Sequence, residues 1–160
     1  MSKPVAGAPA PDFTAPVIAG NDVTACTITL SELRDKPVVL YFYPKDNTPG
    51  CTTQACDLRD NWTLLKKKAH VLGVSVDSLK AHEKFVKKYE LPFPLISDED
   101  HAIVDAYGVW VEKSLYGKKY MGTERSTFVI GTDGIIKAVL EKVKPAGHVQ
   151  QVIAALDAST

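Results

Sequence analysis

The pattern of apolar residues predicts a strand, a helix and a second strand in the first half of the chain. Residues 38–43 form an apolar run of the kind that a fully buried strand shows. Residues 50–68 carry apolar side chains such as Leu58 and Leu65 at helical spacing, which predicts one amphipathic helix. Residues 71–76 form a second apolar run. This order predicts a parallel, right-handed βαβ unit.

A further helix, a short strand and another helix are expected next. Asp77 or Ser78 can cap a helix that runs to about Tyr89, because Pro92 and Pro94 interrupt helical pairing after it. On this helix His82 is interpreted as a packed or partly exposed residue rather than a ligand. The pair Leu95-Ile96 is expected to form a short strand. The segment 97–100, Ser-Asp-Glu-Asp, fits a capping pattern for a helix that Gly108 closes.

The C-terminal part predicts a β-hairpin followed by a helix. Residues 127–130 and 135–140 are apolar runs on either side of the turn Gly131-Thr132-Asp133-Gly134. The final helix is indicated by an apolar stripe that comprises Val149, Val152, Ile153 and Leu156.

The N-terminal part predicts an extended arm and a second hairpin. Residues 1–11 are rich in Pro and Ala and are expected to lie extended on the surface. Residues 12–30 alternate between apolar and polar and are expected to turn at Gly20-Asn21-Asp22. Cys26 falls on the apolar side of this alternation with Ile28, so it is predicted to be a core residue.

Taken in order, these elements predict a thioredoxin-like α/β fold. It has a central mixed β-sheet flanked by helices, preceded by an N-terminal β-hairpin extension. No repeat, low-complexity stretch or internal linker interrupts residues 1–160, so the chain is expected to be a single domain. Fold alone does not decide function.

Composition and charge exclude several classes of function. The chain has 160 residues, of which 45% are hydrophobic and 24% charged, as in globular proteins. Its 19 basic and 19 acidic side chains cancel, so nothing favours binding to nucleic acid or to an anionic membrane. No stretch approaches the length of a transmembrane helix. The absence of paired Cys-x-x-Cys and the scattered His residues argue against zinc, and no other cofactor is indicated.

The three cysteines point to a reducing compartment. Three is an odd number, which would leave one thiol over in a secreted protein, and the first nine residues have no apolar core for a signal peptide. We therefore expect a cytoplasmic protein, in which paired thiols tend to be catalytic or redox-sensing.

Cys51 occupies the position most suited to thiol chemistry. Pro44 ends the strand before it, because proline has no N–H to donate. Thr48 is a good helix N-cap and Pro49 a good first helical residue, which makes Cys51 the third residue of the helix. Unpaired backbone N–H groups and the helix dipole favour a thiolate there. The alternative is that Cys51 is a small apolar filler.

A second cysteine, Cys56, follows five residues later. On an intact α-helix the two Cα atoms lie about 8.6 Å apart. A disulfide needs less than about 7 Å. The pair can therefore be two thiols on a folded helix or one disulfide on a locally unwound helix.

Several motifs resemble the peroxiredoxins. Pro44-x-x-x-Thr48-x-x-Cys51 matches their active-site signature. The segment 50–60, Gly-Cys-Thr-Thr-Gln-Ala-Cys-Asp-Leu-Arg-Asp, is similar to the Q subfamily, also called bacterioferritin comigratory proteins. Segments 97–101, 108–110 and 125–128 resemble that subfamily too. The resemblance extends from about Pro9 to the last helix.

This resemblance implies a thiol-dependent peroxidase that reduces hydrogen peroxide and organic hydroperoxides. Cys51 matches the peroxidatic Cys, which becomes a sulfenic acid. Thr48 would bond the peroxide, Arg125 would hold the thiolate and stabilise the transition state, and Pro44 would shield the site from water. Cys56 matches the resolving Cys, and a thioredoxin- or glutaredoxin-like partner would reduce the resulting disulfide. We expect a monomer or at most a weak dimer.

Two other functions remain open at this stage. The protein could be a redox-sensing thiol relay or a holdase with little peroxidase turnover. It could also be a plain thiol–disulfide oxidoreductase, although that class usually has Cys-x-x-Cys. Arg125 could be a surface ion-pair residue.

Overall fold

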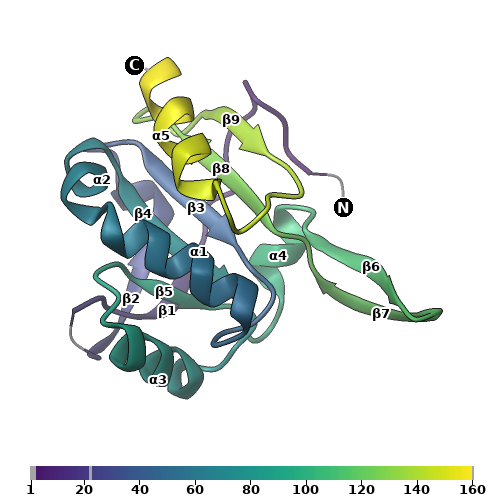
Figure 1. The fold of residues 1–160 in the computed structure, drawn as a ribbon. Helices are drawn as coiled ribbons and strands as arrows, with labels where there is room; N and C mark the ends of the chain where they lie inside the picture. Colours follow the sequence, from purple (N-terminus) through teal and green to yellow (C-terminus); the bar gives the residue numbers. More distant parts are fainter. Residues whose placement is uncertain (1–2, 22, 160) are drawn as a thin grey trace.

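The computed structural model describes residues 3–21 and 23–159 (Figure 1). Their strands are β1 (Thr14–Ile18), β2 (Ala25–Thr29), β3 (Val38–Phe42), β4 (His70–Ser75), β5 (Leu95–Ser97), β6 (Trp110–Leu115), β7 (Lys118–Thr123), β8 (Ser126–Ile130) and β9 (Ile136–Leu140). The helices are α1 (Pro49–Asp60), α2 (Trp62–Lys68), α3 (Leu79–Tyr89), α4 (Ala102–Ala106) and α5 (His148–Ala158), with a 3-10 turn, η1, at Leu30–Glu32.

A seven-stranded mixed sheet runs through the molecule in the order β2-β1-β5-β4-β3-β8-β9. β3 pairs in parallel with β4, and β4 with β5, while the other neighbours are antiparallel. The predicted βαβ unit and mixed sheet are therefore confirmed. β3 lies near the middle and is buried on both faces, which explains its uninterrupted apolar sequence.

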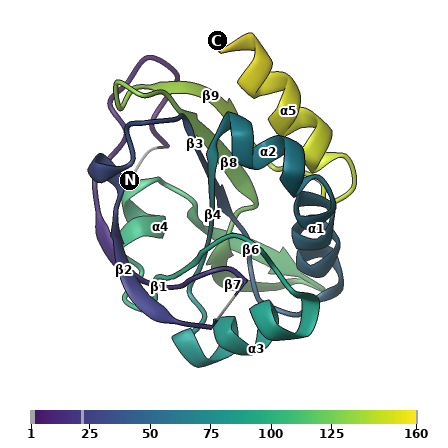
Figure 2. The same cartoon turned by 90° about the vertical axis from the view of Figure 1, so that its left-hand side faces the viewer.

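Helices cover both faces of the sheet (Figure 2). Alternate residues of β3 point in opposite directions, so Val39 and Tyr41 pack under α1, α2, α3 and α5, whereas Leu40 and Phe42 pack toward α4. This arrangement confirms the thioredoxin-like layers. None of the helices in the described part of the chain is long and apolar enough to cross a bilayer.

The helix predicted over residues 50–68 is in fact two helices. α1 ends at Asp60 and α2 starts at Trp62, with Asn61 serving as the cap between them. The side-chain amide of Asn61 donates to the carbonyl of Asp57 (2.9 Å). Asn readily offers the backbone such an alternative bond, which is why it interrupts the helix here.

The prediction that Cys26 is a core residue was wrong. Cys26 is exposed, because β2 is the outermost strand of the sheet and pairs with β1 alone among the described strands. A period-two pattern identifies a strand but does not show whether a helix covers its apolar face. The β1–β2 hairpin itself is confirmed, although Asp22 of its expected turn lies outside the described residues.

The cap of α4 also differs from the prediction. The carboxylate of Asp98, not the hydroxyl of Ser97, accepts the backbone N–H groups of Ile103 (3.0 Å) and Val104 (2.8 Å). The Ser97 hydroxyl instead donates to the carbonyl of Asp77 (2.7 Å). Because Ser97 still belongs to β5, its side chain is directed by the sheet and not by the helix.

The N-terminal arm is bound to the edge of the sheet. The N–H of Gly7 donates to the carbonyl of Ile136, and the N–H of Ile136 donates to the carbonyl of Ala8. The arm thus extends along β9; Met1 and Ser2, which the prediction included, lie outside the described residues.

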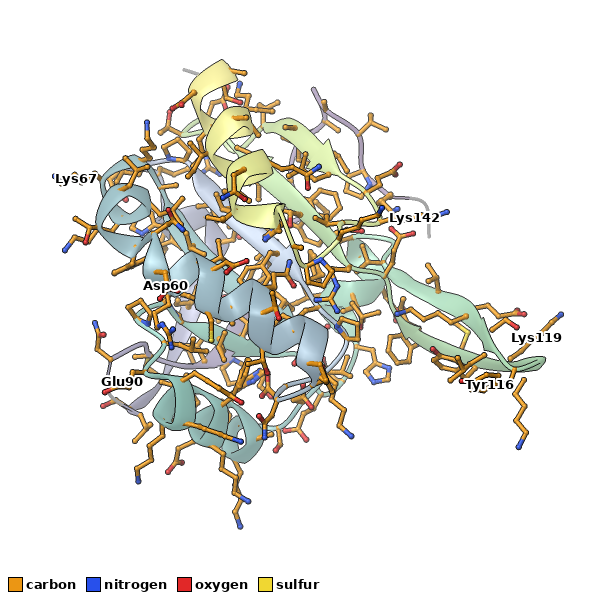
Figure 3. All side chains as sticks on the ribbon, viewed as in Figure 1. Asp60, Lys67, Glu90, Tyr116, Lys119 and Lys142 are labelled. Carbon is orange, nitrogen blue, oxygen red and sulfur yellow. The ribbon has the colours of Figure 1, made fainter. Side chains whose placement is uncertain are left out.

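The β6–β7 hairpin was not predicted. It projects from the body of the molecule, with Tyr116 and Lys119 at its tip (Figure 3). Tyr116 (φ 52°) and Gly117 (φ 77°) both adopt the left-handed backbone region that a tight hairpin turn requires. Tyr-Gly is a weaker turn sequence than Asn-Gly, which explains why the pattern was missed.

Candidate active site

Cys51 lies at the start of α1, directly after the loop that follows β3. Thr48 occupies the N-cap position and Pro49 the first helical position, which confirms the predicted helix start. The Cys51 side chain is buried (2% exposed) and packs among core residues. Its sulfur therefore lies where the helix leaves backbone N–H groups unpaired.

The Thr48 hydroxyl does not cap the helix. It donates to the carbonyl of Lys45 (2.8 Å), and it accepts no helix N–H. The predicted capping bond is therefore wrong for the side chain, although the backbone of Thr48 does stand at the N-cap. A hydroxyl that donates to Lys45 keeps its lone pairs available for another donor.

Arg125 reaches Cys51 from the segment between β7 and β8. Its Nη2 donates to Cys51 Sγ (3.4 Å), and its Nη1 donates to Oε1 of Gln54 (2.6 Å). Because Cys51 and Gln54 are three residues apart on α1, the planar guanidinium spans the first turn of the helix. Arg125 thus places a permanent positive charge beside the sulfur.

Gln54 was not identified as a site residue from the sequence. It appeared only inside the motif around Cys51, and an isolated Gln on a helix is usually exposed. In the structure Gln54 is fully buried and orients Arg125. Its position three residues after Cys51 is the indication in the sequence that the two side chains face the same partner.

Gly50 provides the space that Arg125 occupies. A β-carbon at this position would lie 3.2 Å from Arg125 Nη2 and 3.1 Å from Cγ of Pro145. Either contact is tighter than most real β-carbon contacts, so glycine permits the close approach of the guanidinium. Pro44, half-buried, follows β3 on the strand side of the same loop.

Cys56 is a half-buried thiol on the same helix. Cys51 and Cys56 are both free cysteines, and α1 is continuous from Pro49 to Asp60. The structure therefore corresponds to the form with two thiols on a folded helix. Burial raises the pKa of Cys56, against the opposing effect of Arg59. In the folded helix Cys56 is thus disfavoured as a thiolate.

Two further basic side chains, Lys113 and His148, lie close enough to Arg125 to feel its charge. Burial, with the nearby Arg125 charge as the next cause, lowers the pKa of Lys113 on β6. The same two causes lower the pKa of the buried His148 to about 4. The Nε2 atom of His148 is 2.7 Å from the Thr127 hydroxyl, and at neutral pH the ring is uncharged. Neither residue was singled out from the sequence.

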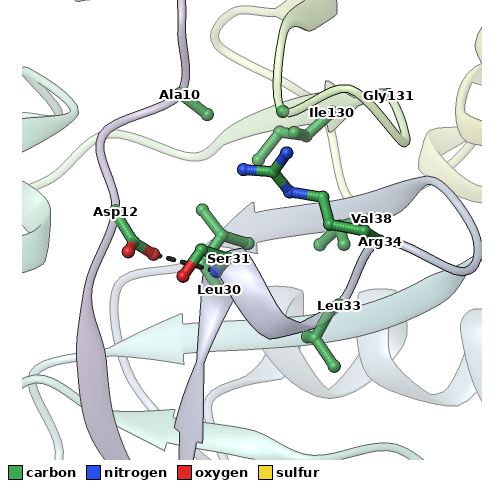
Figure 4. Close-up of a pocket in the computed structure, with 10 residues that line it drawn as sticks. Ala10, Asp12, Leu30, Ser31, Leu33, Arg34, Val38, Ile130 and Gly131 are labelled. Carbon is green, nitrogen blue, oxygen red and sulfur yellow. Dashed lines mark hydrogen bonds between the residues drawn. The ribbon is translucent and has the colours of Figure 1, made fainter.

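A cluster of potential metal ligands and a small cavity lie outside the predicted site. Asp46, Asp77 and His82 form the one group of potential metal ligands within 4.8 Å of one another in the described part of the chain. A cavity of about 20 Å³ lies between η1, the arm and β8, where Asp12 accepts the N–H of Ser31 (Figure 4). This cavity is at the opposite end of β3 from Cys51 and has room for about one water molecule.

Comparisons with known proteins identify related chains. Residues 6–139 match the model of the AhpC/TSA family. The chain is 44% identical to peroxiredoxin Bcp of Escherichia coli strain K12 over 149 residues, which is 92% of each protein.

Two solved structures of Xanthomonas campestris proteins have similar folds. A peroxiredoxin Q structure has a TM-score of 0.83 at 41% identity, covering 91% of this chain and 90% of that one. A structure of the bacterioferritin comigratory protein, described in connection with its alkyl peroxide reduction activity, has a TM-score of 0.83 at 40% identity with the same coverage.

Proposed function

Since this chain belongs to the AhpC/TSA family and is a thiol-dependent peroxidase of the peroxiredoxin type, we propose that Cys51 is the residue that reduces the peroxide. The observation that supports this assignment best is the Arg125 guanidinium, 3.4 Å from Cys51 Sγ at the start of a helix. Of the three cysteines, Cys51 is the one that combines a helix start with a fixed positive charge.

In the first step the Cys51 thiolate attacks the terminal oxygen of the peroxide. A sulfur–oxygen bond forms while the oxygen–oxygen bond breaks, and the departing hydroxide or alkoxide takes up a proton. Cys51 becomes a sulfenic acid, and the product is water or an alcohol. Arg125 and the N–H groups at the start of α1 would stabilise the negative charge that moves between the two oxygens. The Thr48 hydroxyl would accept a hydrogen bond from the bound peroxide.

In the second step Cys56 resolves the sulfenic acid. Its sulfur attacks the sulfur of Cys51, a disulfide forms, the sulfur–oxygen bond breaks and water leaves. A dithiol protein of the thioredoxin or glutaredoxin type would then reduce the disulfide. We infer that the protein works in the reducing cytoplasm, because its thiols must be regenerated.

The substrates are proposed to be hydrogen peroxide and organic hydroperoxides. The related Xanthomonas campestris protein is described as reducing alkyl peroxides, and it shares the fold over nine-tenths of this chain. We also propose that one chain suffices for a turnover, since both cysteines lie on one helix.

Peroxide consumption with a thioredoxin-regenerating system tests the assignment. Wild type should turn over many times, Cys51→Ser should show no turnover, and Cys26→Ser should match wild type because Cys26 is exposed on the outer strand β2. Appreciable turnover by Cys51→Ser would overturn the assignment. A single round of oxidation followed by a stall would indicate a redox sensor instead.

The role of Cys56 is tested by mass spectrometry of the oxidised protein. We expect a peptide pair linked between Cys51 and Cys56. A bond between Cys51 and Cys26 would contradict this role, and it would require a large rearrangement because Cys26 lies on the outermost strand.

A further inference from the structure

Helix α3 contacts the loop before Cys51 at two points. His82 Nδ1 lies 2.6 Å from Oδ2 of Asp46, and the Tyr89 hydroxyl donates to Oδ1 of Asn47 (3.1 Å). His82 and Tyr89 are seven residues apart, which places them two turns apart on one face of α3. Their partners are consecutive residues that directly precede Thr48.

His82 is fully buried and bonded at both ring nitrogens. Its Nε2 lies 2.8 Å from the carbonyl oxygen of Ile96. A carbonyl only accepts, so Nε2 carries a hydrogen and donates it. The other nitrogen, Nδ1, lies at hydrogen-bond distance from a carboxylate oxygen of Asp46, so both ring nitrogens are engaged. His82 and Asp46 form a buried, hydrogen-bonded pair.

Asp46 is held on every side. Its second oxygen accepts the Tyr43 hydroxyl (2.6 Å), and its backbone N–H donates to Oδ2 of Asp77 (2.9 Å). Asp77 in turn accepts the Ser75 hydroxyl (2.6 Å). Because both carboxylate oxygens and the backbone N–H of Asp46 are bonded to neighbouring groups, its position is fixed.

Asn47 is the next residue of this loop. It adopts a left-handed backbone conformation (φ 58°), which Asn tolerates better than most other non-glycine residues and which turns the chain just before Thr48. The bond from Tyr89, together with a longer one from Lys88 (3.4 Å), ties the Asn47 side chain to α3. The direction in which the chain enters Thr48 is therefore set by α3 and β4.

These bonds also explain why three potential metal ligands lie close together. Asp46, Asp77 and His82 are close enough to hold a cation, but the facing atoms of His82 and Asp46 already bond to each other. His82 uses its other nitrogen on Ile96. The cluster is a hydrogen-bonded support for the loop.

We propose that His82, acting through Asp46 and assisted by the bond from Tyr89 to Asn47, is a positioning residue that holds Thr48 where its hydroxyl can bind a peroxide. His82 does not touch the reacting atoms; it fixes the loop that carries the Thr48 hydroxyl. The inference rests on the proposed function, because it assigns His82 to the peroxide step of Cys51.

His82→Gln separates this role from general stability. The variant keeps Arg125 and the helix start, so alkylation of Cys51 by iodoacetamide, which needs no Thr48 contact, should proceed at the wild-type rate. Oxidation of Cys51 by hydrogen peroxide should be slower by roughly 10- to 100-fold, as expected when a reacting group is misplaced by about 1 Å. His70→Gln is the matched control, since His70 pairs with Asp35 (2.7 Å) at an exposed site, and it should change neither rate.

Thr48→Val, introduced into wild type and into the His82→Gln variant, shows whether His82 acts through Thr48. The loss in the double variant should be close to that of Thr48→Val alone, because His82 has nothing left to position. Fully additive losses, an unchanged peroxide rate, or an equal fall in the peroxide and iodoacetamide rates would each overturn the proposal.

Tyr89→Phe provides a second test if His82→Gln does not fold. It removes one hydroxyl from a half-buried residue, and it should slow the peroxide reaction roughly threefold with alkylation unchanged. An unchanged peroxide rate in this variant would count against the proposal. Failure of wild type to react with peroxide would instead overturn the proposed function, so the two failures are distinguishable.

Discussion

At the scale of single residues, the geometry of the site depends on the two contacts that the Arg125 guanidinium makes with α1. Arg125 donates from separate nitrogens to Cys51 and to Gln54 on the same helical turn. A lysine has the same charge but concentrates it in one ammonium group, and it cannot span both acceptors. The chemistry of the thiol is therefore linked to the shape of the side chain beside it as well as to its charge.

Arg125→Lys should weaken both contacts. We expect the oxidation of Cys51 by hydrogen peroxide to be slower by roughly 10- to 100-fold. Arg34→Lys, an exposed arginine near the opposite end of β3, is the control and should behave as wild type. An unchanged oxidation rate in Arg125→Lys would show that the two contacts of the guanidinium do not assist the peroxide step.

At the scale of secondary structure, the proposed disulfide between Cys51 and Cys56 requires α1 to adopt two states. In the reduced form it is continuous and keeps its thiols apart. The distance of about 8.6 Å between their Cα positions on a helix must fall below about 7 Å in a disulfide. A terminal helical turn opens at low cost, so the first turn of α1, which contains Cys51, is the segment that can change.

Oxidation should therefore unwind the first turn and a half of α1. Amide exchange over residues 49–60 should accelerate in the disulfide form, and helical circular dichroism should fall. Cys56→Ser treated with the same peroxide should show neither change, because it cannot form the bond. Identical exchange in the reduced and disulfide forms would refute this mechanism.

The short helix α4 depends on one carboxylate. Asp98, which is almost fully buried, accepts two backbone N–H groups at the start of this five-residue helix. Asp98→Ala would leave both donors unpaired, and we expect the free energy of unfolding to fall by about 2 kcal/mol.

Asp100→Ala is the matched control for this change. Asp100 is exposed and accepts a single N–H, from Ala102 (3.2 Å), so its loss should cost about 0.5 kcal/mol. Urea denaturation measures both variants. Equal losses would mean that Asp98 does not cap the helix in solution.

At the scale of the whole molecule, the buried His148 links folding to pH. Its pKa is about 4 in the folded protein, lowered first by burial and then by Arg125, and about 6.5 in an unfolded chain. Between these values the unfolded chain binds a proton that the folded protein does not. Stability is therefore lost as the pH falls from about 6.5 to 4, and below that the effect levels off.

His148→Gln should remove this dependence. The wild-type free energy of unfolding should fall by up to about 3 kcal/mol more than that of the variant between pH 6.5 and pH 4. Glutamine retains a hydrogen-bonding group for Thr127, which limits other damage. Urea denaturation at several pH values gives the comparison. Parallel curves for the two proteins would show that His148 does not cause the loss.

The sequence by itself determined those features that depend on neighbours along the chain. The start of α1 follows from Thr48-Pro49, and the buried strand β3 follows from a continuous apolar run. The hairpin between β8 and β9 follows from the glycines of residues 131–134. Turn, cap and strand preferences act over a few residues, so they can be inferred from local sequence. Arg125 was identified only through the resemblance to peroxiredoxins.

Only the tertiary structure decided which distant residues meet. Arg125 lies 74 residues from Cys51 in the chain, and His82 lies 36 residues from Asp46. The order of strands in the sheet brings these pairs together, and it also leaves Cys26 on an outer strand despite its apolar pattern. Apolar periodicity indicates which face of a helix or strand is apolar. It does not specify which element, if any, packs against that face.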